Sequence, residues 1–470
     1  MKLWKHQEDG ISKAREMRNL AVFFEAGTGK TLTTLHILKE KEELYGFQMS
    51  TLIVCPVIVM RQWKSEIEKY FPDNEQNVVV LEGTARERMG LYEKAPKDSI
   101  FIINFEGISR IKPILEKIMY NPPQVLVVDE SHKAKAPTSL VSKTLQKLSK
   151  QMEGQPIHHK YILTGSPILN NEIDIWSQYM ILNQGKTFGS NFFAFRNKYF
   201  YDKNKYIQHL HFPKWCFIPS KEAEFKKKLE ETSVQAKKEE CLDLPDLVRV
   251  RVDVPMTKEQ AETYKDMKED FIAFIKGKTA TAPLALTKAL GLQQIVSGFV
   301  KTDDGTVVEF KDTPRQTALE ALLEDLAPQG KVIIWAVFHK NYDVIRSVCN
   351  KLKLKYVELS GEAKEDRFES VKAFQEDESV RVLIGHPGSG GVGVNLTAAK
   401  YSIWWSRSFS LEHEIQATAR NYRGGSEVHN KITRYDLVTP KTLDETVMQA
   451  LENKKDLAER LLDLKNMVDG

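Results

Sequence analysis

The chain has 470 residues, of which 41% are hydrophobic and 28% are charged, and its formal net charge is +4. This composition and length are ordinary for a globular protein of two or three domains. A core of that size is stable without disulfides or structural metal ions. The small net charge argues against a generally basic protein, although it permits a local basic groove.

The four cysteines (Cys55, Cys216, Cys241 and Cys349) form no CxxC pair, which argues against a zinc site and fits free thiols in a reducing compartment. The N-terminus "MKLWKHQEDGISKAREM" is charged and lacks the apolar core of a signal peptide. We see no apolar stretch long enough to cross a bilayer. These features predict a cytoplasmic protein that does not enter a membrane.

The stretch "AVFFEAGTGKTLTTLHILKEKEELYG", residues 21–46, predicts a strand, a glycine-rich turn and a helix. Backbone N–H groups of such a turn and the positive end of the helix dipole form an anion site. Lys30 adds a charge for the outer phosphates of a nucleotide, and the Thr31 hydroxyl can hold Mg²⁺. The alternative is a capped turn with an exposed lysine. The full P-loop pattern would place a glycine at Phe24.

Short apolar runs alternate with longer charged segments in the first half, and this alternation predicts βαβ units and a parallel sheet buried on both faces. The runs are "AVFFEAG", "TLIVCPV", "NVVVL", "IFIINF", "QVLVVDE" and "YILTGS".

Asp129 and Glu130 end the run "VLVVDE", where the carboxyl ends of parallel strands bind ligands. Asp129 is then placed to hold Mg²⁺, and Glu130 to orient or deprotonate the water that attacks the γ-phosphate. The alternative is an acidic pair that caps the following turn.

The middle of the chain has a different composition. Residues 188–240 are rich in Phe, Tyr and Lys and end in "KEAEFKKKLEETSVQAKKEE", which is typical of a solvated helix face. "LVRVRVDV" predicts a strand in the crossing to the second half. Thr257 and Gln260 predict a capping box at the start of the next helix.

The α/β pattern restarts in the second half and predicts a second lobe in tandem. Its runs are "KVIIWAVF", "KYVELSG", "VRVLIGHP", "YSIWWS" and "ITRYDLVT". Near the end of that lobe, Arg420 and Arg423 are three residues apart and share a helix face. Such arginines can stabilise a transferring phosphoryl group, although two solvated surface arginines are the alternative.

Together these runs resemble the motifs of superfamily 2 helicase-type ATPases. More closely, the chain resembles the Swi/Snf-type DNA translocases, in the compact form seen in bacteriophages and mobile elements. In the first half the matching motifs are "LWKHQEDGI", "EAGTGKT", "LIVCPVIVMRQWKSEIEKYF", "FIINFEGISR", "VVDESHKAKAP" and "YILTGSPILNNEIDIWSQYMIL". In the second half they are "KVIIWAVFHKNYDVI", "GHPGSGGVGVNLTAA" and "EIQATARNYRGGS".

The resemblance implies an α/β fold of two tandem RecA-like lobes, each a parallel sheet flanked by helices, with short helical protrusions. The first lobe covers residues 1–242 with a protrusion at about 185–240, and the second covers 243–470 with a protrusion at about 258–325. The resemblance also departs from the family pattern: the acidic residues and methionine that usually open motif I are here Phe24-Glu25-Ala26, and the glutamine that usually closes motif VI is Ser426.

The resemblance further implies site residues. The catalytic residues are Lys30, Asp129, Glu130, Arg420 and Arg423, with Thr31 and Asp129 as metal ligands. The nucleotide-binding residues are Gln7 at the adenine, Glu25, Ala26, Gly27, Thr28, Gly29, Lys30, Thr31, Gly391, Gly393 and Gln416. The nucleic-acid contacts are Arg61, Asn104, Thr164, Ser389, Asn395 and Thr397.

The function implied is an ATP-dependent DNA translocase, with ATP and Mg²⁺ as cofactors and DNA as partner, double-stranded rather than single-stranded. Two alternatives stay open: a helicase that separates DNA or RNA strands, and an ATP-gated clamp or recruiter that does not travel. We expect a monomer, with recombination or replication proteins as further partners.

Overall fold

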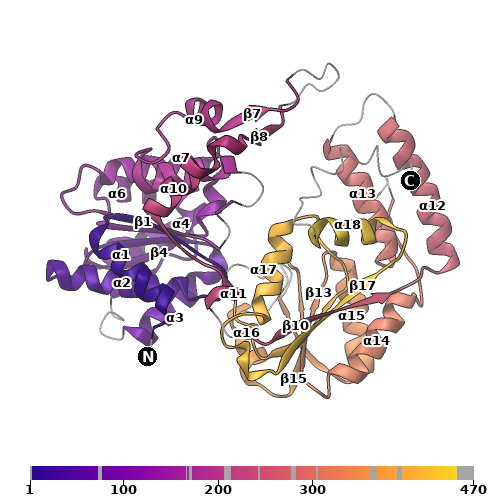
Figure 1. Cartoon of the computed structure of the whole chain (residues 1–470). Helices are drawn as coiled ribbons and strands as arrows, with labels where there is room; N and C mark the ends of the chain where they lie inside the picture. The colour runs from indigo at the N-terminus through magenta and orange to yellow at the C-terminus, as the bar shows by residue number, and fades with distance from the viewer. Residues whose placement is uncertain are drawn as a thin grey trace. The chain divides into compact units, whose positions relative to one another are not determined.

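In the computed structural model, each half of the chain builds a parallel sheet with helices on both faces (Figure 1). The structure describes residues 3–71, 77–165, 167–168, 172–205, 213–241, 244–276, 282–302, 305–359, 367–388 and 394–452. The chain divides into two units, residues 1–243 and 244–470, and each is described by itself.

The first unit holds a parallel sheet in the order β3-β4-β2-β5-β6-β1-β9. Its strands are β1 (Asn19–Phe24), β2 (Thr51–Cys55), β3 (Val78–Val80), β4 (Ile100–Asn104), β5 (Val125–Asp129), β6 (His159–Leu163) and β9 (Ser233–Ala236). Its helices are α1 (Lys5–Glu16), α2 (Lys30–Tyr45), α3 (Met60–Tyr70), α4 (Ala85–Lys94), α5 (Phe105–Arg110), α6 (Lys112–Tyr120), α7 (Leu140–Met152), α8 (Ile175–Asn183), α9 (Phe192–Tyr199), α10 (Glu222–Thr232) and α11 (Lys238–Cys241).

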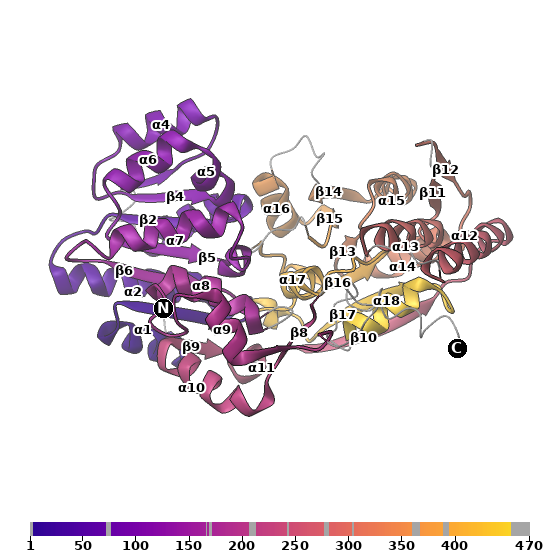
Figure 2. The same ribbon diagram turned by 90° about the horizontal axis from the view of Figure 1, so that it is seen from above.

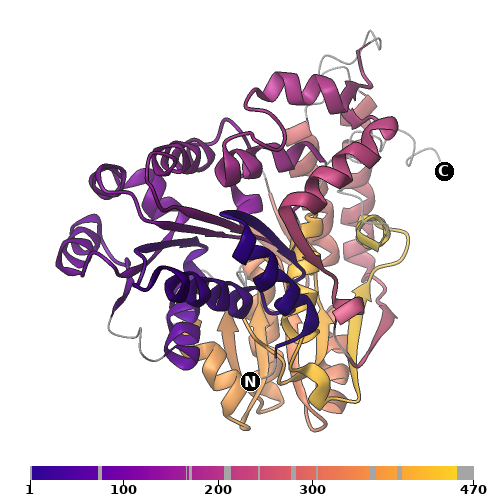
Figure 3. The same cartoon turned by 60° about the vertical axis from the view of Figure 1, so that its left-hand side comes forward.

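Alternate residues of the central strands in this sheet enter two different cores, because successive side chains of a strand point to opposite faces. Along β1, Val22 and Phe24 pack with α1, α2 and α3, whereas Ala21 and Phe23 pack with α5, α7, α8 and α10. Figure 1 shows α1, α2 and α3 on one side of the sheet and α7 and α10 on the other. The same two layers of helices are visible in Figure 3.

The aromatic-rich segment after α8 forms a small subdomain on this unit. It contains α9, a hairpin of β7 (Phe200–Asp202) and β8 (Trp215–Phe217), and α10. Phe225 of α10 lies within 5.0–5.4 Å, ring to ring, of Phe188, Tyr199 and Phe217. The chain then returns to the main sheet as β9, which pairs with β1 at the edge.

The second unit holds a parallel sheet in the order β10-β17-β16-β13-β15-β14. Its strands are β10 (Asp246–Asp253), β13 (Lys331–Trp335), β14 (Lys355–Leu359), β15 (Val380–Gly385), β16 (Ala399–Trp404) and β17 (Lys431–Val438), with a hairpin of β11 (Phe299–Lys301) and β12 (Val307–Glu309). Its helices are α12 (Lys258–Lys276), α13 (Ala282–Val296), α14 (Pro314–Leu326), α15 (His339–Lys351), α16 (Arg367–Glu376), α17 (Leu411–Asn421) and α18 (Leu443–Glu452). Figure 2 shows the hairpin beside α12 and α13.

The predicted α/β class with two tandem parallel-sheet lobes is therefore confirmed. The predicted capping box is also confirmed: the Thr257 amide donates to Gln260 Oε1 at 3.0 Å, and the Gln260 amide donates to Thr257 Oγ1 at 3.1 Å. The two hairpins, β7–β8 and β11–β12, and one strand of the main sheets, β9, are missing from the prediction. β9 lies inside the charged run that was interpreted as a solvated helix, and that run forms α10, β9 and α11.

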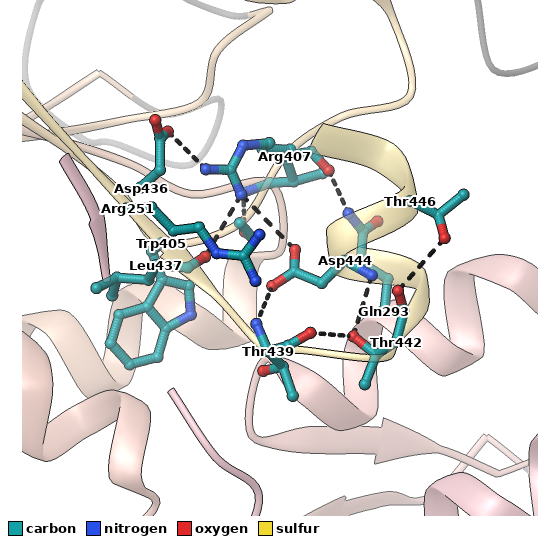
Figure 4. Close-up of polar contacts among 12 residues, drawn as sticks. Arg251, Gln293, Trp405, Arg407, Asp436, Leu437, Thr439, Thr442, Asp444 and Thr446 are labelled. Carbon is teal, nitrogen blue, oxygen red and sulfur yellow. Dashed lines mark hydrogen bonds and ion pairs between the residues drawn. The ribbon is translucent and has the colours of Figure 1, made fainter. Parts of the chain in front are cut away.

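A buried network of charged side chains joins several elements of the second unit (Figure 4). Arg407 pairs with Asp436 of β17 at 2.5 Å, and Arg315 of α14 pairs with Asp444 of α18 at 2.6 Å. All four side chains are buried. Gln293 of α13 donates its side-chain amide to the Arg407 carbonyl oxygen at 2.5 Å. The network ties α13, α14 and α18 to the carboxyl end of the sheet.

Candidate nucleotide site and nucleic-acid interface

The turn between β1 and α2 has the backbone shape of an anion cradle. Gly27 and Gly29 adopt left-handed φ angles of 91° and 86°, which glycine reaches at little steric cost. The Thr28 hydroxyl donates to the Glu25 carbonyl oxygen at 2.8 Å and closes the turn. Gly29 is the N-cap of α2 and provides no side chain to the first N–H groups of the helix. Those groups are thus directed at a ligand position.

The two residues predicted to act on phosphate and magnesium open α2. Lys30 is its first residue, and the Lys30 Nζ donates to the Phe24 carbonyl oxygen at 2.9 Å across the turn. Thr31 follows in the first helical turn and is partly exposed. The turn backbone therefore holds the Lys30 ammonium over the loop, where an outer phosphate would compete for it.

Helix α1 packs against the same turn. His6 Nε2 lies 2.8 Å from the Thr28 carbonyl oxygen. A Cβ atom at Gly29 would lie 2.1 Å from Gln7 Nε2, so only glycine allows the Gln7 amide to come so close. Gln7 is 2% exposed, and its Oε1 accepts from the Trp4 amide at 2.9 Å. The structure thus places Gln7 beside the glycine-rich turn. Its contact with adenine stays a prediction.

Asp129 and Glu130 lie at the carboxyl end of β5, and both are buried. The Glu130 amide donates to Asp129 Oδ1 at 2.9 Å, and the Trp63 indole N–H donates to Asp129 Oδ2 at 3.0 Å. Burial and the neighbouring Glu130 charge raise the pKa of Asp129, against the opposing effects of Lys30 and Trp63. Mg²⁺ prefers oxygen ligands, and the buried carboxyl groups of Asp129 and Glu130 are donors of that kind, as is the hydroxyl of Thr31 at the start of α2.

Glu130 is held by His132 of its own motif and by Thr164 of the next motif. Its φ is 54°, an uncommon backbone conformation outside glycine. The Glu130 Oε2 lies 3.0 Å from His132 Nδ1, and the Thr164 hydroxyl lies 2.9 Å from the same nitrogen and 3.4 Å from Glu130 Oε2. The sequence alone assigns no role to Trp63 or His132, because the Trp63–Asp129 and His132–Thr164 contacts join residues far apart in the chain.

Thr164 was predicted to contact nucleic acid, and the structure places it with the acidic pair. It follows β6, it is fully buried, and its amide donates to the Val22 carbonyl oxygen at 3.2 Å. A Cβ atom at the next residue, Gly165, would lie 3.1 Å from the Ala26 amide nitrogen. Gly165 thus packs directly on the glycine-rich turn. A contact between Thr164 and nucleic acid stays a prediction.

The other predicted nucleic-acid contacts of this unit differ in exposure. Arg61, in the first turn of α3, is exposed, and its Nε lies 3.3 Å from Glu82 Oε2. Asn104, at the end of β4, is 5% exposed. The Asn104 Oδ1 accepts from Arg88 Nη1 at 2.6 Å, and the Asn104 side-chain Nδ2 donates to Glu106 Oε2 at 2.9 Å. Arg88, absent from the prediction, is therefore the basic residue at this strand end.

In the second unit, the predicted residues that the structure describes lie on α17 or in segments that contact it. Gln416 lies on this helix and donates to Glu412 Oε1 at 2.9 Å. Arg420 is 2% exposed, and its carbonyl oxygen accepts from the Leu396 amide at 3.0 Å. Arg423 follows the helix, and its Nη1 donates to the Val394 carbonyl oxygen at 3.4 Å. The structure thus brings the two arginines beside the segment that follows residue 393.

Asn395 and Thr397 lie in that segment. Asn395 is exposed and accepts from the Thr397 amide at 3.1 Å. Thr397 is 7% exposed, and its carbonyl oxygen lies 2.8 Å from His429 Nε2. Ser389, Gly391 and Gly393 lie outside the described residues.

Arg434 of β17 fixes α17 to the sheet. Its guanidinium forms an ion pair with Glu414 and donates to the Thr418 hydroxyl at 3.3 Å, so it holds two successive turns of α17. It also lies 4.2 Å from the centre of the Trp404 ring and 2.8 Å from Asp436 Oδ1. The orientation of α17, and hence of Arg420, depends on this buried arginine.

Two family models match the chain. Residues 9–297 match the SNF2-related domain, and residues 315–425 match the helicase conserved C-terminal domain. The uncharacterized ATP-dependent helicase MG018 of Mycoplasma genitalium is 25% identical over 98% of this chain and 42% of that protein. The ISWI chromatin-remodeling complex ATPase ISW1 of Saccharomyces cerevisiae is 24% identical over 92% of this chain and 37% of that protein.

The chain thus spans about two fifths of the length of these curated relatives. Among solved structures, the Sulfolobus solfataricus SWI2/SNF2 ATPase core in complex with dsDNA is similar over 99% of this chain and 93% of that chain, with 22% identity and a TM-score of 0.44. In the part of the chain that the structure describes, no helix has the length and apolar character needed to span a membrane.

Proposed function

The chain belongs to the SNF2-related family, and from that premise we propose that it is an ATPase, stimulated by nucleic acid, that moves along DNA. The observation that carries the proposal is the meeting of Lys30, Asp129 and Glu130 at the carboxyl edge of one parallel sheet. The Lys30 charge lies close enough to lower the pKa of Asp129. A cation and two buried carboxyl groups around a glycine-rich turn support binding of a metal-complexed nucleotide.

In the first unit, we assign the phosphates of ATP to the backbone N–H groups of residues 25–29 and to Lys30. Thr31 and Asp129 would hold Mg²⁺, which when bound neutralises charge on the phosphate oxygens. Glu130 would orient the attacking water and accept its proton. His132 and Thr164 limit the rotation of the Glu130 side chain through their hydrogen bonds. Gln7 would recognise the adenine.

In the second unit, we assign Arg420 and Arg423 to stabilisation of the transferring phosphoryl group when the two lobes close on the nucleotide. Gln416 and the glycines at 391 and 393 would contribute further nucleotide contacts. Closure and reopening of the lobes would then drive a short step along the DNA, as in other enzymes whose chemistry is gated by domain closure.

We assign the nucleic-acid path to phosphate contacts from Arg61, Asn104, Thr164, Ser389, Asn395 and Thr397. Phosphate contacts determine position and affinity without reading sequence. The exposed positions of Arg61 and Asn395 support this assignment. The assignment is weaker for Asn104, Thr164 and Thr397, whose side chains are buried. The monomeric state and the recombination or replication partners stay predictions.

The rate of ATP hydrolysis, measured with no nucleic acid and then with single-stranded DNA, double-stranded DNA and RNA, tests this proposal. We expect double-stranded DNA to stimulate most. If single strands stimulate best and a forked duplex is unwound, the chain is a strand-separating helicase. If no nucleic acid changes the rate, and the rate without it is negligible, the proposal is wrong.

A further inference from the structure

Trp63 connects the start of α3, which is assigned to nucleic acid, with Asp129, which is assigned to the metal. It lies in the first half of α3, two residues after Arg61, and its side chain is 1% exposed. The loop after β2 leads into α3, and β2 pairs with β5, whose last residue is Asp129. Because the two strand ends are neighbours, the indole of Trp63 reaches Asp129 Oδ2 at 3.0 Å.

This hydrogen bond restricts the Asp129 carboxyl group to one orientation. An indole N–H is a donor only, so the oxygen facing it must act as an acceptor. The other oxygen accepts from the Glu130 amide at 2.9 Å. With one donor fixed on each oxygen, rotation of the carboxyl group breaks both hydrogen bonds. The surroundings are dry: Cys55 at the end of β2 is fully buried, and burial raises the pKa of its thiol.

The same helix has an exposed basic residue at its start. Arg61 is exposed and paired with Glu82, a contact for which a phosphate would compete. Arg61 and Trp63 belong to one helical turn, so a shift of the start of α3 moves both. The start of α3 therefore carries two functional contacts. Arg61 is assigned to nucleic acid, and Trp63 donates a hydrogen bond to the Asp129 carboxyl group that is assigned to the metal.

We propose that Trp63 is a positioning residue: its indole N–H fixes the Asp129 carboxyl group for the metal–nucleotide complex and couples that group to nucleic acid bound at the start of α3. This inference rests on the proposed function and adds a residue that touches neither ligand. It predicts that loss of the N–H weakens metal binding and the response to DNA, without weakening DNA binding itself.

The test is the substitution Trp63→Phe, which keeps an aromatic ring in the core and removes the indole N–H donor. Trp176→Phe is the matched control, because Trp176 is 6% exposed in the same unit and its indole N–H donates to the Gly189 carbonyl oxygen at 3.0 Å. Affinity for Mn²⁺ in the presence of ADP is measured by electron paramagnetic resonance. DNA affinity without nucleotide and the stimulation of hydrolysis by duplex DNA are measured in parallel.

We expect Trp63→Phe to weaken Mn²⁺ binding by about tenfold, as for other residues that orient a metal ligand. Stimulation by DNA should fall while DNA affinity stays at the wild-type value, and Trp176→Phe should match the wild type in all three. Equal Mn²⁺ affinity and equal stimulation in Trp63→Phe and wild type would overturn the inference. Absence of Mn²⁺–ADP binding in the wild type itself would instead overturn the proposed function.

A second replacement decides the question if Trp63→Phe does not fold. β-(3-Benzothienyl)alanine at position 63 keeps the two fused rings and replaces the N–H with sulfur. Thermal melting identifies which variants are folded. A folded benzothienyl variant with wild-type Mn²⁺ affinity contradicts the inference, and one with weakened affinity and unchanged DNA binding supports it.

Discussion

At the scale of single residues, the proposal depends most on Lys30. Replacing Lys30→Ala removes the charge that would meet the outer phosphates. We expect hydrolysis of ATP to fall by at least roughly a hundredfold, in line with loss of a charged group that stabilises the transition state. DNA binding without nucleotide should survive. Lys39→Ala is the control, because Lys39 is exposed on the same helix. If the Lys30→Ala protein hydrolyses ATP as fast as the Lys39→Ala protein, the assignment of Lys30 to the phosphates is wrong.

Arg423 tests the assignment made in the second unit. Arg423→Ala should leave ATP affinity within a few-fold of wild type, because most assigned nucleotide contacts lie in the first unit. Turnover should fall by roughly a hundredfold or more, within the range for a lost arginine finger. Arg423→Lys should be equally impaired if the planar guanidinium is required. Steady-state kinetics separate these effects. Weakened DNA binding with intact hydrolysis would place Arg423 on the nucleic-acid path instead.

Sequence patterns predict the position of a single residue well where a recognisable motif lies at the end of a strand. Lys30, Asp129 and Glu130 are in this class, because a strand end and a glycine-rich turn determine where they lie. Asn104 differs: the resemblance implies a nucleic-acid contact, which stays a prediction, and the structure shows that its side chain forms hydrogen bonds with Arg88 and Glu106. The contacts of Trp63 with Asp129 and of His132 with Thr164 join different motifs, and a single sequence does not reveal such contacts.

At the scale of elements, β9 shows why local patterns fail. Its four residues, Ser233–Ala236, follow a charged helix and contain no long apolar run. Its position is determined by pairing with β1, where Phe24 is opposite Ala236, and the Ala236 carbonyl oxygen accepts from the Glu25 amide at 3.0 Å. The strands that were recognised contain several apolar residues, even at the sheet edges β3, β10 and β14, whereas β9 has the sequence "SVQA" with one large apolar residue.

The subdomain around α10 gives a stability prediction at this scale. Phe225 is 3% exposed and contacts three other aromatic rings, so Phe225→Ala leaves a cavity. We expect a loss of about 3–5 kcal/mol in the unfolding free energy of the first unit. Phe193→Ala is the matched control, since Phe193 is 62% exposed. Thermal melting compares the two. Equal melting temperatures would show that the aromatic cluster contributes little to the fold.

The Arg434–Glu414 contact gives a prediction about α17. The substitution Arg434→Met removes the buried charge and keeps an unbranched chain close in length to the aliphatic part of arginine, but it leaves Glu414 without this partner. We expect turnover to fall because α17 loses its anchor, while affinity for ATP changes little. Lys431→Met is a control on the same strand, with an exposed side chain. Turnover of Arg434→Met equal to that of Lys431→Met would exclude an effect of Arg434 on Arg420.

At the scale of the whole molecule, two lobes and a modest net charge fit a motor that holds phosphates and must release them. We expect double-stranded DNA to stimulate hydrolysis more than RNA does, with little dependence on sequence. The stimulation should weaken steeply as salt rises, because binding through phosphates releases counterions. Titration of DNA at several salt concentrations measures the slope. A flat response to salt, or a strong sequence preference, would contradict binding through phosphates.

Displacement of a triplex-forming strand from duplex DNA tests the central claim most directly. A protein that travels along duplex removes the third strand without separating the other two. We predict displacement with ATP, none with a non-hydrolysable analogue, and none by Lys30→Ala. Hydrolysis that DNA stimulates, with the third strand left in place, would contradict translocation and would identify an ATP-gated clamp.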